Sequence, residues 1–350
     1  MQTKCETHGE VFTNQTLESP VEVLAQNVTF EHCKFISKDP QHTLLTTGLN
    51  TQVHDCDFYG DYLLGARRGI AVNSAGVTVT NSRFRDIFHA QDAQCIAGWD
   101  GTRDLLVEDC YGEASGENVI FGGSDCQDES RIPQNITIRR CYFTKLLWWK
   151  SKPNGATIKN LLELKNCKNV LVEDCDFSNS WTDGQTGFGL VLTVRNQDGA
   201  NPYATVEDVI IRRSVFRDIE QGIQILGIDD THPSQSMKRV SLESVRVVFS
   251  GGNGVQLGNG VEGLSFDKCN FWSSNASKWL AFNCPDRPIT GLVVSNSDAN
   301  EGEYGILGDD SSPGTPTIQK YAPDARFTNV SLWRGNSGNT YPYPSGITVY

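Results

Sequence analysis

The sequence has no apolar run long enough to cross a membrane, because its uninterrupted apolar stretches contain only four to six residues, against about 20 for a membrane-spanning helix. The N-terminus, MQTKCETHGEVF, lacks the basic and then apolar pattern of a secretion signal. We therefore expect no membrane contact. Either a leader has been removed, or the protein leaves its cell by another route, such as the release of virions by lysis.

Positive charge is also scarce, since 30 Lys and Arg face 42 Asp and Glu and give a formal net charge of −12. A general nucleic-acid binder carries a basic face, so we do not expect DNA or RNA as the main partner. The fractions of charged residues, 21%, and hydrophobic residues, 38%, are those of a globular protein rather than a disordered one.

The 11 cysteines show no paired spacing of the kind that marks a zinc site or a disulfide knot. Most of them fall inside strand patterns, where a thiol acts as a small hydrophobic side chain. We therefore favour buried free thiols over disulfides. Cys5, Cys126 and Cys284 fall outside the repeat described next and are the better disulfide candidates.

One motif recurs along the chain and reads x-h-x-h-x-x-[C/S]-x-[F/Y], where h is apolar. Its copies are separated by 23 to 39 residues, so constant strands alternate with loops of variable length. The clearest copies are NVTFEHCKF, GVTVTNSRF, DLLVEDCYG, NITIRRCYF, NVLVEDCDF, DVIIRRSVF and GLSFDKCNF.

The motif predicts two short strands joined by a corner. Its two apolar positions alternate and so share one face, as do the Cys or Ser and the aromatic position after the corner. No long window shows the i+3 and i+4 spacing of an amphipathic helix. Stacking of successive copies predicts two interior ladders, one of thiols and one of rings, formed by Cys110, Cys141 and Cys175 and by Phe143, Phe177 and Phe216.

A second family of β-rich segments occurs once between successive copies of the motif, as in ENVIFGG, NLLELKN and FGLVLTVRN. Two or three short parallel sheets per coil, closed by tight turns, form a β-helix. The sequence therefore predicts an all-β, single-stranded, right-handed parallel β-helix of about ten or eleven coils. We expect residues 1–26 to form the N-terminal cap, 27–310 the β-helix, and 311–350 the last coil and the C-terminal cap.

Charged residues enter the second family of strands in the middle coils. Glu163 and Lys165 alternate with leucines and should point outward. We align Arg195 with Lys165 one strand spacing away, and Gln224 and Gln256 with Glu163. The two stacked cations repel each other unless an anion lies near. Glu163 and a carboxylate or sulfate of a polysaccharide could supply that negative charge.

The longest loops flank the same coils and could wall a groove. Trp148, Trp149 and Trp181 lie on these loops, and exposed aromatic rings suit stacking against sugar rings. The alternative is that the three rings simply pack the loops onto the helix. Asp229 and Asp230 lie on another of these loops.

A second polar group precedes these coils, and ion pairing is its favoured explanation. Its members are Arg67, Arg68, Asp92, Gln94, Glu117 and Asn118.

The stretches GENVIFGGSD, NLLELKNCKNVLVEDC, QTGFGLVLTVRNQDG and GIDDTHPSQ resemble the pectate-lyase-like β-helix superfamily over about residues 60–240. More narrowly, they resemble right-handed β-helix repeat proteins of bacteria and phages. The resemblance implies polysaccharide substrates, cleaved by β-elimination or by hydrolysis. It also implies a relation to phage spikes, which bind or cut host surface glycans, usually as trimers.

The resemblance leaves the metal open. Pectate lyases use a carboxylate cluster that holds Ca²⁺, and no set of Asp residues here matches that cluster residue by residue. The sequence also lacks the aspartate set of polygalacturonase-type hydrolases. Asp229 and Asp230 match the DD pair of that set, but its NTD motif is missing here. We expect no metal or cofactor, with Ca²⁺ as the alternative.

Two classes of function remain. In a glycan-cleaving enzyme, Glu163 would be an acid or base, and Lys165 or Arg195 a base or a carboxylate clamp. Asp198 or Asp229 would pair with Glu163 in the two-carboxylate arrangement of a glycosidase.

The other class is a non-catalytic spike, fibre or capsid decoration protein, with a secreted adhesin as a third alternative. In every case we expect an extracellular or virion-surface protein that faces a polysaccharide. It could form a homo-trimer or be attached to a virion.

Overall fold

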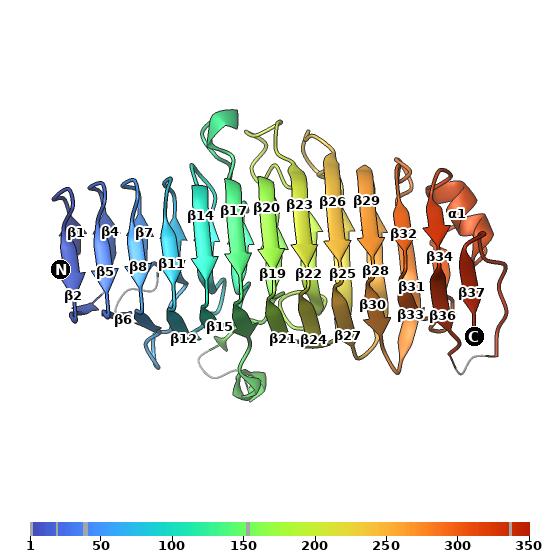
Figure 1. Ribbon diagram of the computed structural model, residues 1–350, viewed down its shortest axis with the longest axis horizontal. Helices are drawn as coiled ribbons and strands as arrows, with labels where there is room; N and C mark the ends of the chain where they lie inside the picture. The colour runs from blue at the N-terminus through green and yellow to red at the C-terminus, as the bar shows by residue number, and fades with distance from the viewer. Residues whose placement is uncertain (1–2, 19, 38–40, 152–154, 336–337) are drawn as a thin grey trace.

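The computed structural model describes residues 3–18, 20–37, 41–151, 155–335 and 338–350. The chain winds into a rod with its termini at opposite ends (Figure 1). Each coil contributes one short strand to each of three sheets, and all the strand pairs between coils are parallel. Sheets A and B contain 12 strands each and sheet C contains 13. The predicted all-β, right-handed parallel β-helix is confirmed.

Sheet A contains the second family of segments. Its strands are β1 (Thr3–Cys5), β4 (Val21–Val23), β7 (Leu44–Thr46), β10 (Arg68–Val72), β13 (Gln94–Gly98), β16 (Val119–Phe121), β19 (Leu162–Leu164), β22 (Phe188–Thr193), β25 (Gln221–Leu226), β28 (Gly252–Gly258), β31 (Ala276–Asn283) and β34 (Ile306–Gly308).

Sheet B contains the first half of the motif. Its strands are β2 (Val11–Thr13), β5 (Thr29–Glu31), β8 (Gln52–His54), β11 (Thr78–Thr80), β14 (Arg103–Glu108), β17 (Gln134–Arg139), β20 (Cys167–Glu173), β23 (Val206–Arg212), β26 (Met237–Glu243), β29 (Val261–Asp267), β32 (Val293–Ser295) and β35 (Arg326–Thr328).

Sheet C contains the second half. Its strands are β3 (Thr16–Glu18), β6 (Lys34–Ile36), β9 (Asp57–Tyr59), β12 (Arg83–Ile87), β15 (Tyr111–Ala114), β18 (Tyr142–Thr144), β21 (Asp176–Ser180), β24 (Val215–Ile219), β27 (Arg246–Phe249), β30 (Asn270–Trp272), β33 (Asp298–Asn300), β36 (Val330–Trp333) and β37 (Ile347–Val349).

The ends differ from the expected caps. Residues 3–18 supply β1, β2 and β3, so this part of the expected N-terminal cap is itself a coil. The number of coils is therefore slightly larger than the ten or eleven expected. Near the C-terminus, the helix α1 (Thr315–Tyr321) packs against β34, and Tyr321 stacks on Phe282. Residues 1, 2, 19, 336 and 337 of the expected caps lie outside the described residues.

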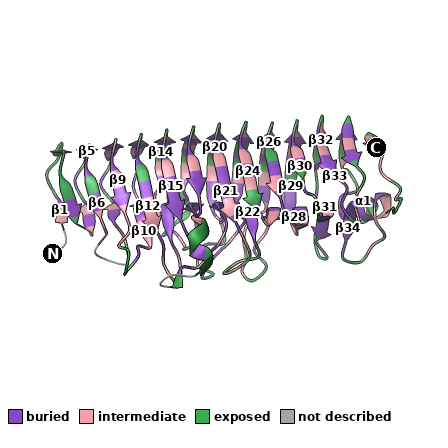
Figure 2. Ribbon diagram, turned by 90° about the horizontal axis from the view of Figure 1, so that it is seen from below, coloured by how far each residue is buried: buried purple, intermediate pink, exposed green. Residues whose placement is uncertain are grey.

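The interior is built from stacked side chains, as the motif predicts. Phe143, Phe177 and Phe216 are partners in the parallel register, and their successive ring centroids are 5.7 and 4.6 Å apart. All 11 cysteines are buried and none forms a disulfide. The buried colour of Figure 2 accordingly runs through the strands along the whole rod.

The connections from sheet C to sheet A are longest in the middle coils, where they and the neighbouring connections from sheet A to sheet B stand out from the rod (Figures 1 and 2). They include two short 3-10 helices, η1 (Glu129–Arg131) and η2 (Leu147–Ser151). The loops therefore flank sheet A on both sides. Among the described residues, no helix is long and apolar enough to cross a membrane.

Candidate functional site

The outer face of sheet A forms a groove of about 350 Å³ in the middle coils, between β19 and β31. Its floor contains Glu163, Gln224 and Gln256, and Lys165, Arg195 and Asp230 lie along one side. Gln185 and Thr186, on the connection to β22, lie on the opposite side. Six of the residues proposed from the sequence therefore meet in a single groove.

The register of the floor corrects one prediction. Glu163 pairs with Val191, which pairs with Gln224 and then with Gln256, so the two glutamines continue its column as expected. In the next coil, the position that continues the column of Lys165 is occupied by Thr193 and not by Arg195. The strands align through their inward leucines, which pair Leu164 with Leu192. Arg195 lies further along, where its backbone N–H donates to the carbonyl of Lys165 at 2.9 Å.

Glu163 is almost completely buried at the floor of the groove, with 2% of its side chain exposed. Its Oε2 accepts from Asn160 Nδ2 at 3.0 Å, and its Oε1 lies 3.3 Å from Lys165 Nζ. Burial, together with the neighbouring carboxylate of Glu117, raises the pKa of Glu163 despite the Lys165 ammonium. A carboxyl group in this environment holds its proton at a higher pH than an exposed glutamate.

Glu117 is the partner that keeps the negative charge. Its Oε2 accepts from Gln94 Nε2 at 2.7 Å, and its Oε1 lies 3.3 Å from Lys159 Nζ. Burial alone would raise the pKa of Glu117, but the Lys159 ammonium and the Gln94 amide hold it below its usual value. Lys159 also contacts Asp92. The chain of contacts from Asp92 to Lys165, which we call the strip, joins the two polar groups that the sequence suggested separately.

Lys145 is a buried charge that the sequence reasoning missed. Its Nζ donates to the backbone carbonyls of Ala114, at 3.0 Å, and Gly116, and lies 3.3 Å from Asn118 Oδ1. Burial lowers the pKa of Lys145 to about 7, while Glu117 acts in the opposite direction. The signal in the sequence was the position of this lysine, two residues after the inward ring of Phe143.

Arg195 links the groove to the loop between β25 and β26. Its Nη1 lies 3.3 Å from Asp229 Oδ1 and also contacts Asp230. Asp229 is buried and accepts the backbone N–H groups of Asn196, Thr231 and His232, and so holds the loop in place. Asp230 is more than half exposed, and its hydrogen bond with Arg195 lowers its pKa. Of this acidic pair, Asp230 is therefore the one that faces the groove.

Asp198 does not line the groove, in contrast to the pairing with Glu163 expected from the sequence. It is exposed on the loop after β22, and its backbone N–H donates to Asp125 Oδ2 at 3.1 Å. The second carboxylate in the groove is Asp230 instead.

The three tryptophans proposed from the sequence lie in three different surroundings. Trp149 is completely buried against Phe88 beneath the loop, as the packing alternative predicted. Trp148 is partly exposed and stacks on Tyr62, with ring centroids 6.3 Å apart. Trp181 lines a separate hollow on the connection from sheet C to sheet A. None of the three lines the groove that contains Glu163.

The described residues contain no group of three or more His, Cys, Asp or Glu side chains placed to hold a metal ion. The chemistry that the groove offers is that of a buried carboxyl group, an exposed carboxylate and two cations.

No family model matches the chain, and no curated protein matches its sequence. Solved structures with a similar path of the chain include three phage tailspikes. The tailspike of E. coli bacteriophage HK620 in complex with a pentasaccharide is 12% identical, with a TM-score of 0.43, and the match covers 96% of this chain and 60% of that one. The tailspike gp49 of Acinetobacter baumannii bacteriophage Fri1, a capsular polysaccharide depolymerase, is 12% identical, with a TM-score of 0.43 and coverages of 97% and 57%.

The Dettilon tailspike gp208 is 11% identical, with a TM-score of 0.48 and coverages of 97% and 60%. The chain thus spans about three fifths of the length of these proteins. The likeness is one of fold alone.

Proposed function

We propose that the protein binds an acidic polysaccharide along the groove of sheet A and hydrolyses its glycosidic bonds. The observation that carries this proposal is the presence of two carboxyl groups in one groove whose pKa values are shifted in opposite directions. That of Glu163 is raised, and that of Asp230 is lowered. Such a pair supplies the proton donor and the ionised carboxylate that glycoside hydrolysis requires.

Glu163 is the proton donor in this mechanism. Its carboxyl group lies at the floor of the groove, where it would protonate the glycosidic oxygen of a sugar chain lying over Gln224 and Gln256. Glu117 is a positioning residue, because its negative charge in the next coil keeps the proton on Glu163. Asp230 is the ionised partner, and acts as base or nucleophile once the substrate draws Arg195 away from it.

Lys165 and Arg195 define the class of substrate. Both side chains line the groove, and each is partly exposed. A guanidinium group binds a carboxylate or sulfate in a bidentate manner. A polysaccharide with acidic sugars would therefore bind more tightly than a neutral one. Display on the outside of a virion or cell, and assembly as a trimer, belong to this proposal as well.

Glu163→Gln tests the proposal, because glutamine keeps the shape of the side chain but cannot donate the acid proton. The purified chain would be incubated with polygalacturonate, alginate, hyaluronan and bacterial capsular polysaccharides. We expect new reducing ends from at least one substrate, without the ultraviolet absorbance of an unsaturated product. Glu163→Gln should lower the rate by about 10²- to 10⁴-fold, whereas Glu243→Gln, on sheet B, should leave it unchanged.

The second candidate is a non-catalytic glycan-binding protein of a virion surface. It is favoured by the fact that both carboxyl groups already have protein partners, Lys165 and Asn160 for Glu163 and Arg195 for Asp230. This alternative predicts polysaccharide binding that Arg195→Ala weakens, with no cleavage by the unmodified chain. Cleavage with an unsaturated product would contradict both candidates and indicate a lyase.

A further inference from the structure

A row of three exposed aromatic rings lies on the outer face of sheet C in the last coils, far from any site considered so far. Trp272, Trp333 and Tyr350 are 37%, 43% and 61% exposed. The ring centroids of Trp272 and Trp333 are 6.4 Å apart, and those of Trp333 and Tyr350 are 5.1 Å apart. We call these three residues the aromatic row. Exposing large aromatic rings to water is unfavourable, and a contiguous exposed apolar patch usually marks a binding site.

The same column of sheet C carries mostly polar or small side chains elsewhere. Thr144 pairs with Ser178, which pairs with Arg217. Tyr59 is a single ring of this column near the N-terminal end. In the last coils the rings lie close together, because Trp272 and Trp333 flank Asn300 in the register. The two tryptophan rings are closer than the roughly 9.6 Å of two strand spacings, so they lean toward each other over the coil of Asn300.

A polar hollow of about 680 Å³ opens beside the aromatic row. Its walls include Ser273, Asn275 and Glu303 from connections between sheet C and sheet A, Asn300 at the end of β33, and Arg334 directly after β36. Ser273 and Arg334 directly follow the two tryptophans of the row. Ring surface therefore lies immediately next to amide, hydroxyl and charged groups that can donate and accept hydrogen bonds.

The geometry points to a second saccharide-binding site, formed by the aromatic row and this hollow, for a neutral hexose polysaccharide. A pyranose ring has an apolar C–H face, which packs on an aromatic ring, and a rim of hydroxyl groups, which matches amides and carboxylates. The one acidic and one basic side chain named above, Glu303 and Arg334, balance in charge. The groove of sheet A, by contrast, presents Lys165 and Arg195.

The site does not depend on the proposed hydrolysis, but the fold connects the two. The strand β31 begins with Ala276 at the hollow and ends with Asn283 at the groove. At about 3.3 Å per residue, these two positions lie roughly 23 Å apart. The second site could therefore hold the chain on a glycan surface while the groove acts on a neighbouring segment, which raises the effective concentration of substrate.

The test is affinity electrophoresis of the full chain in gels that contain galactomannan, hydroxyethyl cellulose or lichenan, with polygalacturonate as the acidic comparison. We expect at least one neutral polysaccharide to retard the chain, and Trp333→Ala or Trp272→Ala to weaken that binding by about tenfold or more, equivalent to about 1.4 kcal/mol. Trp333→Phe should keep most of the retardation. Arg195→Ala, in the groove, should keep all of it, so a failure of the proposed hydrolysis would leave this result intact.

Tyr350→Ala covers the case in which a tryptophan variant fails to fold, because Tyr350 is the most exposed of the three rings. It should weaken binding by several-fold with no change in the thermal unfolding temperature. Lack of retardation by all three neutral polysaccharides, or retardation that survives all three alanine variants, would overturn the inference. So would a loss of oligomers on Trp333→Ala in mass measurements without loss of glycan binding, since the row would then be a contact between copies of the chain.

Discussion

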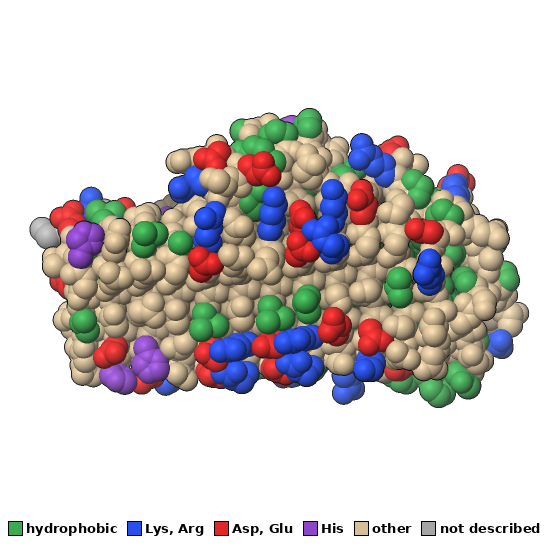
Figure 3. All heavy atoms as spheres, turned by 45° about the horizontal axis from the view of Figure 1, so that its top comes forward, with side chains coloured by type: hydrophobic (Ala, Val, Ile, Leu, Met, Phe, Trp, Pro, Cys, Tyr) green, Lys and Arg blue, Asp and Glu red, His purple; other side chains and the backbone are tan. Residues whose placement is uncertain are grey.

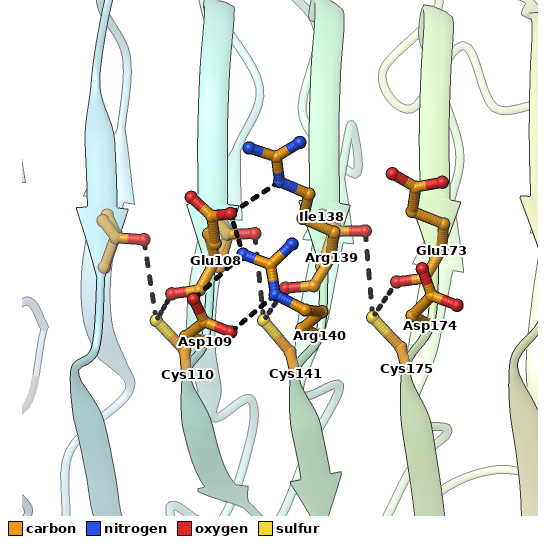
Figure 4. A network of polar contacts seen from close by, with 12 residues as sticks. Glu108, Asp109, Cys110, Ile138, Arg139, Arg140, Cys141, Glu173, Asp174 and Cys175 are labelled. Atoms are coloured by element: carbon orange, nitrogen blue, oxygen red, sulfur yellow. Dashed lines mark hydrogen bonds and ion pairs between the residues drawn. The ribbon is translucent and has the colours of Figure 1, made fainter.

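Two regions of the rod carry many charged side chains, and they differ in how those side chains are paired and buried. Along the corner between sheets B and C, charged side chains alternate in sign from coil to coil, and we call the eight residues of this arrangement the rail. They are Glu108, Asp109, Arg139, Arg140, Glu173, Asp174, Arg212 and Arg213. All of them are exposed or half-buried except Glu173, which is buried. Figure 3 shows acidic and basic side chains paired along the long axis, and Figure 4 shows at close range the contacts of Arg139 and Arg140 with the carboxylates of the preceding coil.

The rail satisfies its charges with direct contacts. Arg140 Nε lies 2.9 Å from Asp109 Oδ1, and Arg213 Nε lies 2.8 Å from Asp174 Oδ1. The strip on sheet A, in contrast, buries its two glutamates, and their surroundings lower the pKa of Glu117 and raise that of Glu163. Regular repetition thus produces ion pairs that lower the pKa of each carboxyl group, whereas a break in the repetition produces a carboxyl group with a raised pKa.

The largest expected difference between the two regions concerns stability. Glu117→Ala leaves the half-buried Lys159 without one of its two carboxylates and leaves the buried Gln94 amide without its acceptor. Breaking a buried ion pair in this way costs about 3–5 kcal/mol, measured as the free energy of unfolding in urea. Glu108→Ala, the matched change on the rail, should cost much less. Equal losses would show that burial does not distinguish the strip from the rail.

Lys145 gives the next largest effect, through pH. Its pKa is about 7 in the folded chain and about 10.4 when exposed by unfolding. Between these values the unfolded state binds more protons, so this lysine makes the folded chain more stable as pH rises, by up to about 1.4 kcal/mol per pH unit. Lys145→Met removes that contribution. The difference in unfolding free energy between the unmodified chain and Lys145→Met should therefore shift in favour of the unmodified chain from pH 7 to 8.5, and a constant difference would contradict it.

Glu163 should show the opposite sign. Because its pKa is raised in the folded chain, the folded state binds the proton more tightly than the unfolded state, and its stability falls as pH rises above about 4.3. Glu163→Gln imitates the protonated form at every pH. We expect it to become more stable than the unmodified chain as pH increases, by about 1.4 kcal/mol for each unit of pKa shift. Paired denaturation curves at pH 4 and pH 7 measure this, and parallel pH profiles would argue that Glu163 is ionised.

The regular parts of the molecule could be predicted from the sequence, because a β-helix repeats one local rule. The motif placed Phe143 on Phe177 and identified the thiols as buried, since each position depends only on its own coil and the two beside it. The same regularity placed Gln224 and Gln256 in the column of Glu163.

The irregular parts could not be predicted, because loops of different length shift the strands of sheet A. The alignment of Arg195 with Lys165 set FGLVLTVRN against NLLELKN two residues out of register, because the strands align through inward leucines. The contact between Glu163 and Glu117 crosses a connection of 40 residues between β16 and β19, which contains β17, β18 and η2. The periodicity of the sequence does not show that Glu117 and Glu163 lie next to each other. The burial of Trp149 similarly depends on how its loop folds back onto Phe88.

The smallest effect sharpens the description of the rail. Arg140 adopts a left-handed backbone conformation with φ of 51°, which non-glycine residues rarely adopt. Arg140→Ala keeps this strained conformation and loses the ion pair, whereas Arg140→Gly loses the ion pair but relieves the strain. We expect the glycine variant to be at least as stable as the alanine variant in thermal unfolding. Because exposed pairs are screened by salt, the small loss on Arg140→Ala should shrink further in 1 M NaCl. If the loss instead stays constant with salt, the rail contributes through packing, and the contrast with the strip is one of burial alone.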